Sequence, residues 1–202
     1  MHKLSYFIGN INILNKLSVP RGTILKMNIE KIKSEIRTVL DYPQKGIVFR
    51  DLTTVFKNSE SLHYLAEQMY EAYKNKGITK IVGIESRGFI MGPILATKLK
   101  AGFVPVRKKG KLPAETISES YSKEYGIDTI EIHKDALDEN DVVLIHDDLL
   151  ATGGTMQAAH NLVKKFNVKE IYMNFIIELI GLNGRKNMDE EINDKITSFI
   201  RF

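Results

Sequence analysis

The sequence has no cysteine among its 202 residues. Thiol catalysis, cysteine-ligated zinc, iron–sulfur clusters and a disulfide framework are therefore excluded. No apolar run approaches the roughly 20 residues that span a bilayer, so we expect no membrane partner. Hydrophobic residues make up 43% and charged residues 27% of the chain, which is ordinary for a globular protein. A chain of this length buries roughly 70% of its unfolded surface, so its core needs no covalent or metal staple.

Acidic residues are lacking from the first 26 positions, which contain Lys3, Lys16, Arg21 and Lys26. These four residues account for the whole net charge of +4, so the rest of the chain is electrically balanced. A balanced body offers no broad surface to a polyanion, and we expect no nucleic-acid partner.

We interpret residues 1–26 as an N-terminal extension outside the core, and 27–202 as one domain. A basic leader without acids is also typical of an organelle transit peptide, although this one has little arginine or serine. We therefore expect a cytoplasmic protein, with an organelle as the alternative.

From Asn28 onward, the hydrophobic spacing predicts alternating helices and strands. A first helix is expected from Asn28 to just before Pro43, and a second after an N-cap at Asn58 or Ser59. Short buried runs that are typical of strands then alternate with helices. The predicted strands are 80–84, 102–106, 127–132, 142–145 and 171–179, and the predicted helices among them include 89–99 and a helix through 158–166.

This alternation favours an α/β fold with a mainly parallel sheet of about five strands, flanked by helices on both faces. Residues 46–56 are expected to be extended, and the first helix and GIVFRD at 46–51 are expected to form a small N-terminal hood. In an open parallel sheet the ligand binds beyond the carboxyl ends of the strands. Three segments occupy that position, namely 85–88, 107–111 and 147–155.

The segment 147–155 has the features of a phosphate-binding loop. Asp147 and Asp148 end a buried strand, and TGGT at 152–155 opens the next helix. The two glycines let backbone amides converge, and the helix N-terminus attracts an anion. The carboxylates can accept hydrogen bonds from ribose hydroxyls and stabilise positive charge near an anomeric carbon. Asp147 and Asp148 alone could also form an exposed acidic turn, but the whole string favours a sugar-phosphate site.

The string VLIHDDLLATGGT at 143–155 resembles the phosphoribosyl pyrophosphate (PRPP) motif of the type I phosphoribosyltransferases. Five further strings are similar, in order, to the adenine phosphoribosyltransferase family: GIVFRD at 46–51, ESRGF at 85–89, RKKGKLP at 107–113, SYSKEYG at 120–126 and IHKDAL at 132–137. The resemblance implies the type I fold, with adenine and PRPP reacting through an oxocarbenium-like transition state to give AMP and diphosphate. It also implies Mg²⁺, held mainly by PRPP and water with no direct protein ligand, and a homodimer.

The resemblance places the PRPP phosphate and ribose on one loop, whose residues are Asp147, Asp148, Ala151, Thr152, Gly153, Gly154 and Thr155. The pyrophosphate of PRPP carries several negative charges, which cationic side chains beyond the strand ends can meet. The candidates are Arg87, Arg107, Lys108 and Lys111. Lys108 and Lys109 could instead belong to a solvated surface.

The polar stretch 107–126 is long for a simple connection, and we interpret it as a lid that closes over the ribosyl centre and excludes water. The resemblance implies that Glu124 is the general acid/base near adenine N7. A carboxylate can serve there if closure raises its pKa by desolvation. Glu124 could also be an exposed loop acid, and residue chemistry alone does not separate it from Glu115 and Glu119.

For adenine, the resemblance implies backbone contacts from Val48 and Arg50, with Phe49 near the ring. Backbone groups suit a base that presents donors and acceptors on one edge, while apolar side chains cover its faces. From the residues alone, Ile47, Val48 and Phe49 could equally belong to the core.

His146 stands where an aliphatic strand residue is expected. It could tune the charge of Asp147, but a packed core histidine is the simpler interpretation. Two other functions deserve comparison. A PRPP-sensing regulator would need a nucleic-acid-binding module, which is not visible. A 6-oxopurine phosphoribosyltransferase would need a donor to O6, such as a lysine, and none lies near GIVFRD.

Overall fold

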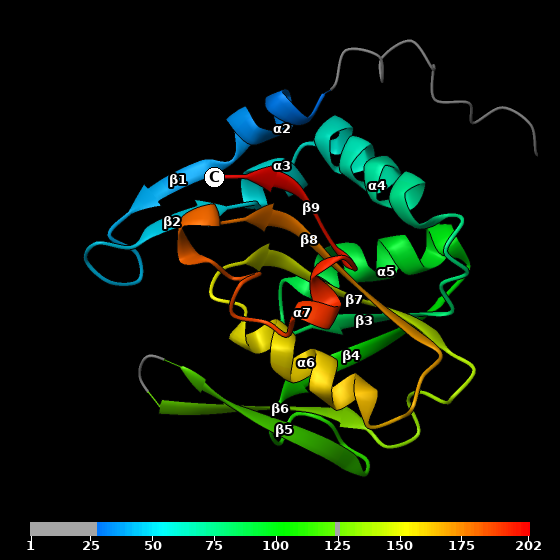
Figure 1. Ribbon diagram of the computed structural model, residues 1–202. Helices are drawn as coiled ribbons and strands as arrows, with labels where there is room; N and C mark the ends of the chain where they lie inside the picture. Colours follow the sequence, from blue (N-terminus) through cyan, green and yellow to red (C-terminus); the bar gives the residue numbers. More distant parts are fainter. Residues whose placement is uncertain (1–27, 124–125) are drawn as a thin grey trace, which may run out of the picture.

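The computed structural model describes residues 28–123 and 126–202. The predictions for residues 1–26 and for Glu124 lie outside these described residues. The described chain forms a central sheet with helices on both faces and a separate two-stranded hood (Figure 1). The predicted α/β architecture is confirmed.

The central sheet has seven strands among the described residues, in the order β5-β6-β4-β3-β7-β8-β9. The predicted sheet of about five strands is thus too small by two, and the predicted strand 127–132 belongs to an antiparallel one. Five neighbouring strands are parallel. They are β4 (Gly102–Lys108), β3 (Lys80–Ile84), β7 (Val142–Leu150), β8 (Glu170–Glu178) and β9 (Ile196–Arg201). The central strand β7 is apolar because a parallel strand in this position is covered on both faces.

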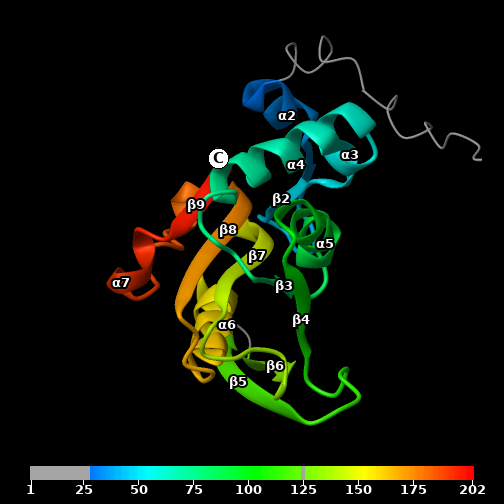
Figure 2. The same ribbon diagram turned by 90° about the vertical axis from the view of Figure 1, so that its right-hand side faces the viewer.

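Helices α4 (Ser59–Tyr73) and α5 (Gly88–Leu99) cover one face of the sheet, and α6 (Gly154–Lys164) covers the other (Figures 1 and 2). Alternate side chains of β7 therefore enter different cores. Val143 and Ile145 pack with α6, whereas Leu144 packs with α4 and α5. Asn58 caps α4, as predicted, by accepting hydrogen bonds from the backbone N–H groups of residues 60 and 61.

The hood consists of α2 (Ile29–Glu35), β1 (Arg37–Leu40), β2 (Val48–Asp51) and α3 (Thr53–Phe56). The prediction of one helix from Asn28 to Pro43 is wrong beyond Glu35. Residues 37–40 instead pair antiparallel with β2. A strand is favoured over a helix here because β-branched Thr38 and Val39 prefer an extended backbone, and β2 supplies the hydrogen-bond partners. Leu40 is 69% exposed.

At one edge of the sheet, β5 (Thr116–Lys123) and β6 (Gly126–His133) form an antiparallel hairpin beside β4. The polar stretch 107–126 is therefore not a loop throughout, because β5 in its second half extends the sheet. The hairpin is docked on the end of α6, where Lys165 Nζ donates to Glu119 Oε2 at 2.6 Å and to the Ser118 carbonyl at 2.8 Å.

After β8 the chain forms η1 (Ile180–Leu182) and α7 (Glu190–Asn193) before it enters β9. The sequence analysis predicted none of these elements. Arg185 holds the segment in place, because its Nε donates to Glu178 Oε1 at 2.8 Å and its Nη1 donates to the Ile196 carbonyl at 3.0 Å. No helix in the described ranges is long and apolar enough to cross a bilayer.

Candidate active site

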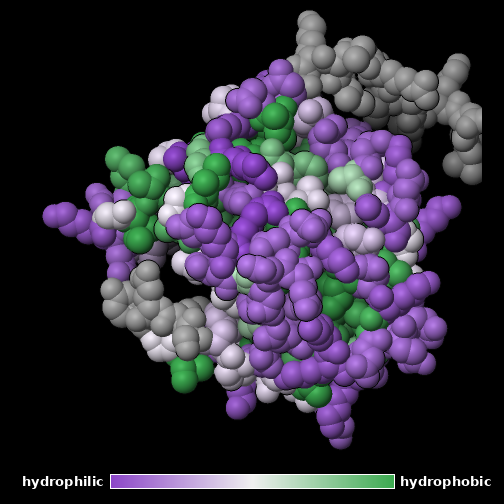
Figure 3. Space-filling model, viewed as in Figure 1, coloured by the Kyte–Doolittle hydropathy of each residue, from purple (hydrophilic) through white to green (hydrophobic). Residues whose placement is uncertain are grey.

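A cavity of about 740 Å³ opens at the carboxyl ends of the parallel strands, between the hood and the β5–β6 hairpin. Figure 3 shows the hollow from outside, with hydrophobic side chains gathered on the neighbouring β1–β2 loop. Five parts of the chain line the cavity: 47–50 of the hood, Arg87 at the start of α5, Tyr121 of the hairpin, the loop between β7 and α6, and the segment that follows β8. The structure thus brings the predicted base, ribose and phosphate segments to one place.

The loop between β7 and α6 forms a smaller pocket of about 170 Å³, lined by Asp147 and by all residues from 149 to 156. α6 begins at Gly154, so its N-terminal amides face this pocket. Thr155 Oγ1 donates to Tyr121 Oη at 3.2 Å, which ties the loop to the hairpin. A pocket of this form suits a monophosphate.

Gly153 supports the turn in a conformation that other residues rarely adopt, with φ at +89°. A Cβ on Gly153 would lie 2.5 Å from the carbonyl oxygen of Gly184. A Cβ on Gly184 would lie 2.3 Å from the carbonyl oxygen of Ala151. The phosphate loop therefore packs backbone to backbone against the segment after β8, and only glycine allows that approach.

Asp147 and Asp148 lie within β7, just before its end at Leu150, rather than in an exposed turn. Asp148 is only 1% exposed, and Asp147 is partly buried. Burial raises the pKa of Asp147, and repulsion from the Asp148 carboxylate raises it further. Burial also raises the pKa of Asp148, against the opposing effect of Arg87. Any positive charge or hydroxyl donor that arrives beside this pair relieves its repulsion and desolvation.

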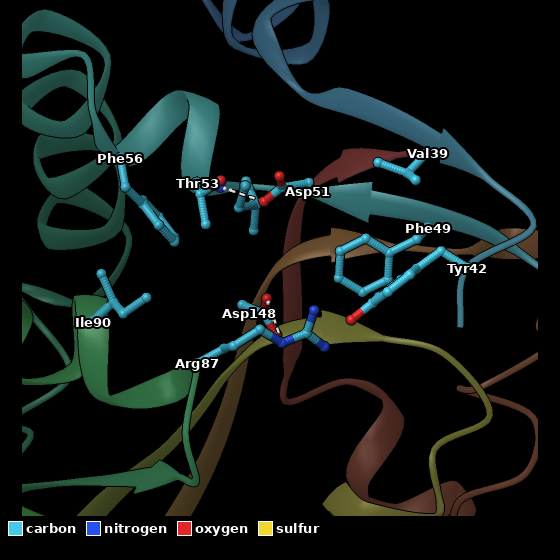
Figure 4. A pocket seen from close by; sticks show the side chains of 10 residues that line it. Val39, Tyr42, Phe49, Asp51, Thr53, Phe56, Arg87, Ile90 and Asp148 are labelled. Carbon is cyan, nitrogen blue, oxygen red and sulfur yellow. Dashed lines mark hydrogen bonds and ion pairs between the residues drawn. The ribbon is translucent and has the colours of Figure 1, made fainter.

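Arg87 lies between the base-binding strand and the acidic pair. Its Nε is 3.1 Å from Asp148 Oδ2, and its guanidinium carbon is 5.5 Å from the centre of the Phe49 ring (Figure 4). These two contacts span a second, mostly apolar cavity of about 330 Å³ between the hood and α5. Arg87 therefore touches the predicted base and ribose sites at once, and it stands apart from the other predicted pyrophosphate cations.

Those other cations gather around Glu85, which the sequence analysis did not single out. Glu85 accepts hydrogen bonds from Lys111 Nζ at 2.6 Å, Arg107 Nη2 at 3.3 Å and the Lys108 N–H at 2.9 Å. Burial acts to raise the pKa of Glu85, but these donors outweigh it and hold the pKa at about 2. The Lys108 side chain points elsewhere and lies 4.0 Å from Asp128.

The base-binding segment lies at the surface of the cavity and not in the core. Ile47 is 47% and Val48 is 44% exposed, which excludes the core interpretation for both. The Phe49 ring packs edge-on against Tyr42, with 5.2 Å between the ring centres. β2 thus presents its backbone and the Phe49 ring to the cavity.

The opposite wall comes from Leu179 and Leu182, with Asn187 beside them. Sequence reasoning missed this wall, although one signal was available. The segment follows the predicted strand 171–179, and the carboxyl ends of neighbouring parallel strands lie at the same edge of a sheet. Asn187 Nδ2 also donates to the Thr152 carbonyl at 3.0 Å, which joins this wall to the phosphate loop.

Two of the three acids in the polar stretch are engaged away from the cavity. Glu115 pairs with Lys134 at 3.0 Å, and Glu119 pairs with Lys165 at 2.6 Å. Hydrogen bonding from Lys165 lowers the pKa of Glu119. Glu124 lies outside the described residues, and its role stays a prediction.

His146 is a core residue with no exposed surface, as the simpler interpretation held. Its Nδ1 donates to Asn174 Oδ1 at 2.9 Å on the neighbouring strand β8. Burial lowers the pKa of His146 from 6.5 to about 4, against the effect of the Asn174 hydrogen bond. The ring is therefore neutral at physiological pH and carries no charge toward Asp147.

We expect the protein to lose stability in mild acid because of His146. The unfolded histidine binds a proton below pH 6.5, whereas the folded one stays neutral until about pH 4. The free energy of unfolding therefore falls through this window, by about 3 kcal/mol from this residue. In urea titrations between pH 7 and pH 4, His146→Val should reduce the fall by about that amount. His63→Gln, at an exposed site, is the control, and equal pH dependence of His146→Val and wild type would contradict the assignment.

No cluster of three or more histidine and acidic side chains that could hold a metal occurs within 28–123 and 126–202. Oδ1 of Asp148 is one of the buried polar atoms that lack a hydrogen-bond partner within these ranges. The described residues thus fit a metal ion that takes most of its ligands from a bound phosphate compound and water.

Comparisons with known proteins show which family the chain belongs to. Residues 53–200 match the family model of the phosphoribosyl transferase domain. The chain is 64% identical over 174 residues to an adenine phosphoribosyltransferase of Bacteroides fragilis, covering 86% of this chain and 98% of the relative. The adenine phosphoribosyltransferase of Rhodothermus marinus has a similar structure, with a TM-score of 0.81, 48% identity and coverage of 90% and 99%. The Giardia lamblia enzyme complexed with 9-deazaadenine has a TM-score of 0.83, 41% identity and coverage of 87% and 98%.

Proposed function

The chain belongs to the adenine phosphoribosyltransferase family of the type I phosphoribosyltransferases, and we propose that the 740 Å³ cavity is its active site. The protein is a pentosyltransferase of purine salvage that converts adenine and PRPP to AMP and diphosphate. The observation that carries the site assignment is the order of its parts. A phosphate pocket, an acidic pair and an apolar slot follow one another in the order of phosphate, ribose and base in AMP. The slot is the part of the cavity between Phe49 on one side and Leu179 and Leu182 on the other.

The loop 151–155 binds the 5′-phosphate of PRPP through converging backbone amides and the hydroxyls of Thr152 and Thr155. Asp147 and Asp148 accept hydrogen bonds from the ribose hydroxyls. As the bond from C1′ to diphosphate breaks, positive charge develops on the ribose ring. The acidic pair stabilises that charge, and its own desolvation and mutual repulsion make the gain larger.

Adenine binds between the Phe49 ring on one side and Leu179 and Leu182 on the other. The backbone groups of Val48 and Arg50 contact its polar edge. Glu124 takes the proton from N7 as N9 attacks C1′, so a neutral base becomes a neutral product. Water is excluded when the β5–β6 hairpin closes the cavity, which protects the ribosyl centre from hydrolysis.

Pyrophosphate binds where Arg107, Lys111 and the backbone N–H of Lys108 now meet Glu85. These donors already lie together around the Glu85 carboxylate. When pyrophosphate binds, they exchange this carboxylate for an anion with more negative charge. Arg87 contributes from the other side, where it neutralises part of the charge of Asp148.

Mg²⁺ is proposed as the cofactor, held mainly by PRPP oxygens and water. Oδ1 of Asp148, which has no partner among the described residues, would accept from one of those waters. The ion neutralises charge on the leaving diphosphate.

A homodimer is also proposed. The exposed positions of α5 include Ile90, which is 39% exposed, and sedimentation velocity measures the mass. A cytoplasmic location is proposed as well, and an organelle is the alternative if residues 1–26 act as a transit segment.

The test is diphosphate release from PRPP and Mg²⁺ with adenine, hypoxanthine, guanine or no base. We expect turnover with adenine and at least about 100-fold less with the 6-oxopurines, because their O6 meets no matching donor. Turnover that is equal with hypoxanthine would contradict adenine specificity. PRPP binding without turnover on any base would identify a regulator instead of an enzyme.

A further inference from the structure

Phe202, directly after β9, lies against the hood. Figure 1 shows the end of β9 beside the two hood strands. The guanidinium carbon of Arg50 on β2 is 4.1 Å from the centre of the Phe202 ring. Lys33 Nζ on α2 is 4.8 Å from the same centre, and it also donates to the Arg201 carbonyl at 2.6 Å. Two cations of the hood thus rest on one aromatic ring of the main body.

The backbone of Phe202 contacts the opposite wall of the base slot. Its N–H donates to the Glu178 carbonyl at 3.0 Å, and its carbonyl accepts from the Ile180 N–H at 2.9 Å. Ile180 begins η1, the turn that carries Leu182 into the cavity. A single residue therefore holds β2 through its ring and the turn of Leu182 through its backbone.

The hood needs such a support because its sheet has only two strands and does not join the central sheet. An isolated two-stranded sheet is marginally stable in water, so its position depends on contacts with the body. Arg50 also donates to Thr38 on β1, so a contact made on Arg50 acts on both hood strands.

We propose that Phe202 is a positioning residue that sets the width of the adenine slot, between Phe49 on β2 and Leu182 on η1. The proposal rests on the proposed function of this slot as the adenine site. Phe202 does not line the cavity, so it acts on adenine through Arg50 and Ile180 and not by direct contact.

The first experiment compares the steady-state kinetics of wild type and Phe202→Ala. Losing the ring should raise the KM for adenine about tenfold, because the contact and its packing are worth roughly 1–2 kcal/mol. The KM for PRPP, and kcat at saturating adenine, should stay within about twofold of wild type. Phe202→Trp keeps an aromatic face and should restore the adenine KM. An unchanged adenine KM in Phe202→Ala, or equal rises in both KM values, would overturn the proposal.

Phe199→Leu is the matched control, because Phe199 lies on β9, three residues before Phe202, and packs against the same core. No cation–π contact of Phe199 occurs among the described residues. It should leave the adenine KM unchanged, and a tenfold rise there would show that the effect is not specific to Phe202. Phe202→Leu replaces Phe202→Ala if the alanine variant does not fold, because it keeps apolar volume but presents no aromatic face to the cations.

A second measurement separates this proposal from the proposed function. A double-mutant cycle of Phe202→Leu and Arg50→Met is followed by urea unfolding, which requires no substrate. If the changes in the free energy of unfolding are not additive, Phe202 and Arg50 interact, which supports the proposal. Additive changes overturn it. If wild type does not use adenine at all, the proposed function fails, but the cycle still tests the contact.

Discussion

Glu124→Ala is expected to lower kcat by about 10²–10³-fold while the dissociation constant for PRPP stays within about twofold of wild type. The proposed role of Glu124 is proton transfer at adenine N7, which occurs only as N9 attacks C1′. An interaction made only in the transition state reduces kcat and kcat/KM together and leaves ground-state binding unchanged. Steady-state rates combined with equilibrium binding of PRPP measure both quantities.

Glu115→Ala is the matched control for this experiment. Glu115 belongs to the same polar stretch, but its carboxylate pairs with Lys134 at the far end of the hairpin, where its side chain is 82% exposed. We expect wild-type kcat from this variant. If Glu124→Ala weakened PRPP binding as much as turnover, Glu124 would have a structural role and the general acid/base would have to be sought elsewhere.

Gly153→Ala should produce the second large effect, a loss of at least about 100-fold in kcat/KM for PRPP together with reduced stability. An L-residue at the φ of Gly153 costs about 1–2 kcal/mol by itself. The added Cβ would also lie 2.5 Å from a carbonyl oxygen, so the backbone has to move. In the proposed site the amides of this same turn hold the 5′-phosphate, so a shift of the turn removes the binding geometry.

Urea unfolding and PRPP titration of Gly153→Ala together test this expectation. Gly181→Ala is the control, since a Cβ at Gly181 would meet nothing within 4 Å. A Gly153→Ala variant with wild-type affinity for PRPP would show that the loop tolerates the strain, and the assignment of the phosphate site to 151–155 would fail.

The fold was predictable wherever short-range features decide the structure. The strands 80–84 and 142–145 are short apolar runs, and they are buried because parallel strands in the middle of a sheet have two covered faces. The Asn58 cap and the glycines of the phosphate loop act on backbone groups within a few residues, so their effect is visible in the sequence.

The prediction was wrong where a partner distant in the chain decides the structure. Residues 37–40 have helical spacing of apolar side chains, but pairing with β2 makes them a strand. Residues 116–123 are too polar to suggest a core element, and they become a strand because β6 supplies their hydrogen bonds. Strand β9 was missed, and it exists beside β8 for the same reason. Strand pairing depends on the partner more than on intrinsic propensity.

The sequence by itself determined the proposed chemistry of this protein. The phosphate loop, the acidic pair and the base segment are each formed by a few consecutive residues, so their local geometry depends mainly on neighbours in the chain. Only the tertiary structure decided how these parts work as one site. Arg87 bridges Phe49 and Asp148, Glu85 gathers Lys111 and Arg107, and Leu182 closes the slot that Phe202 braces. Each of these contacts joins residues that lie far apart in the chain, and such distances become short only when burial of the two cores brings the strand ends together.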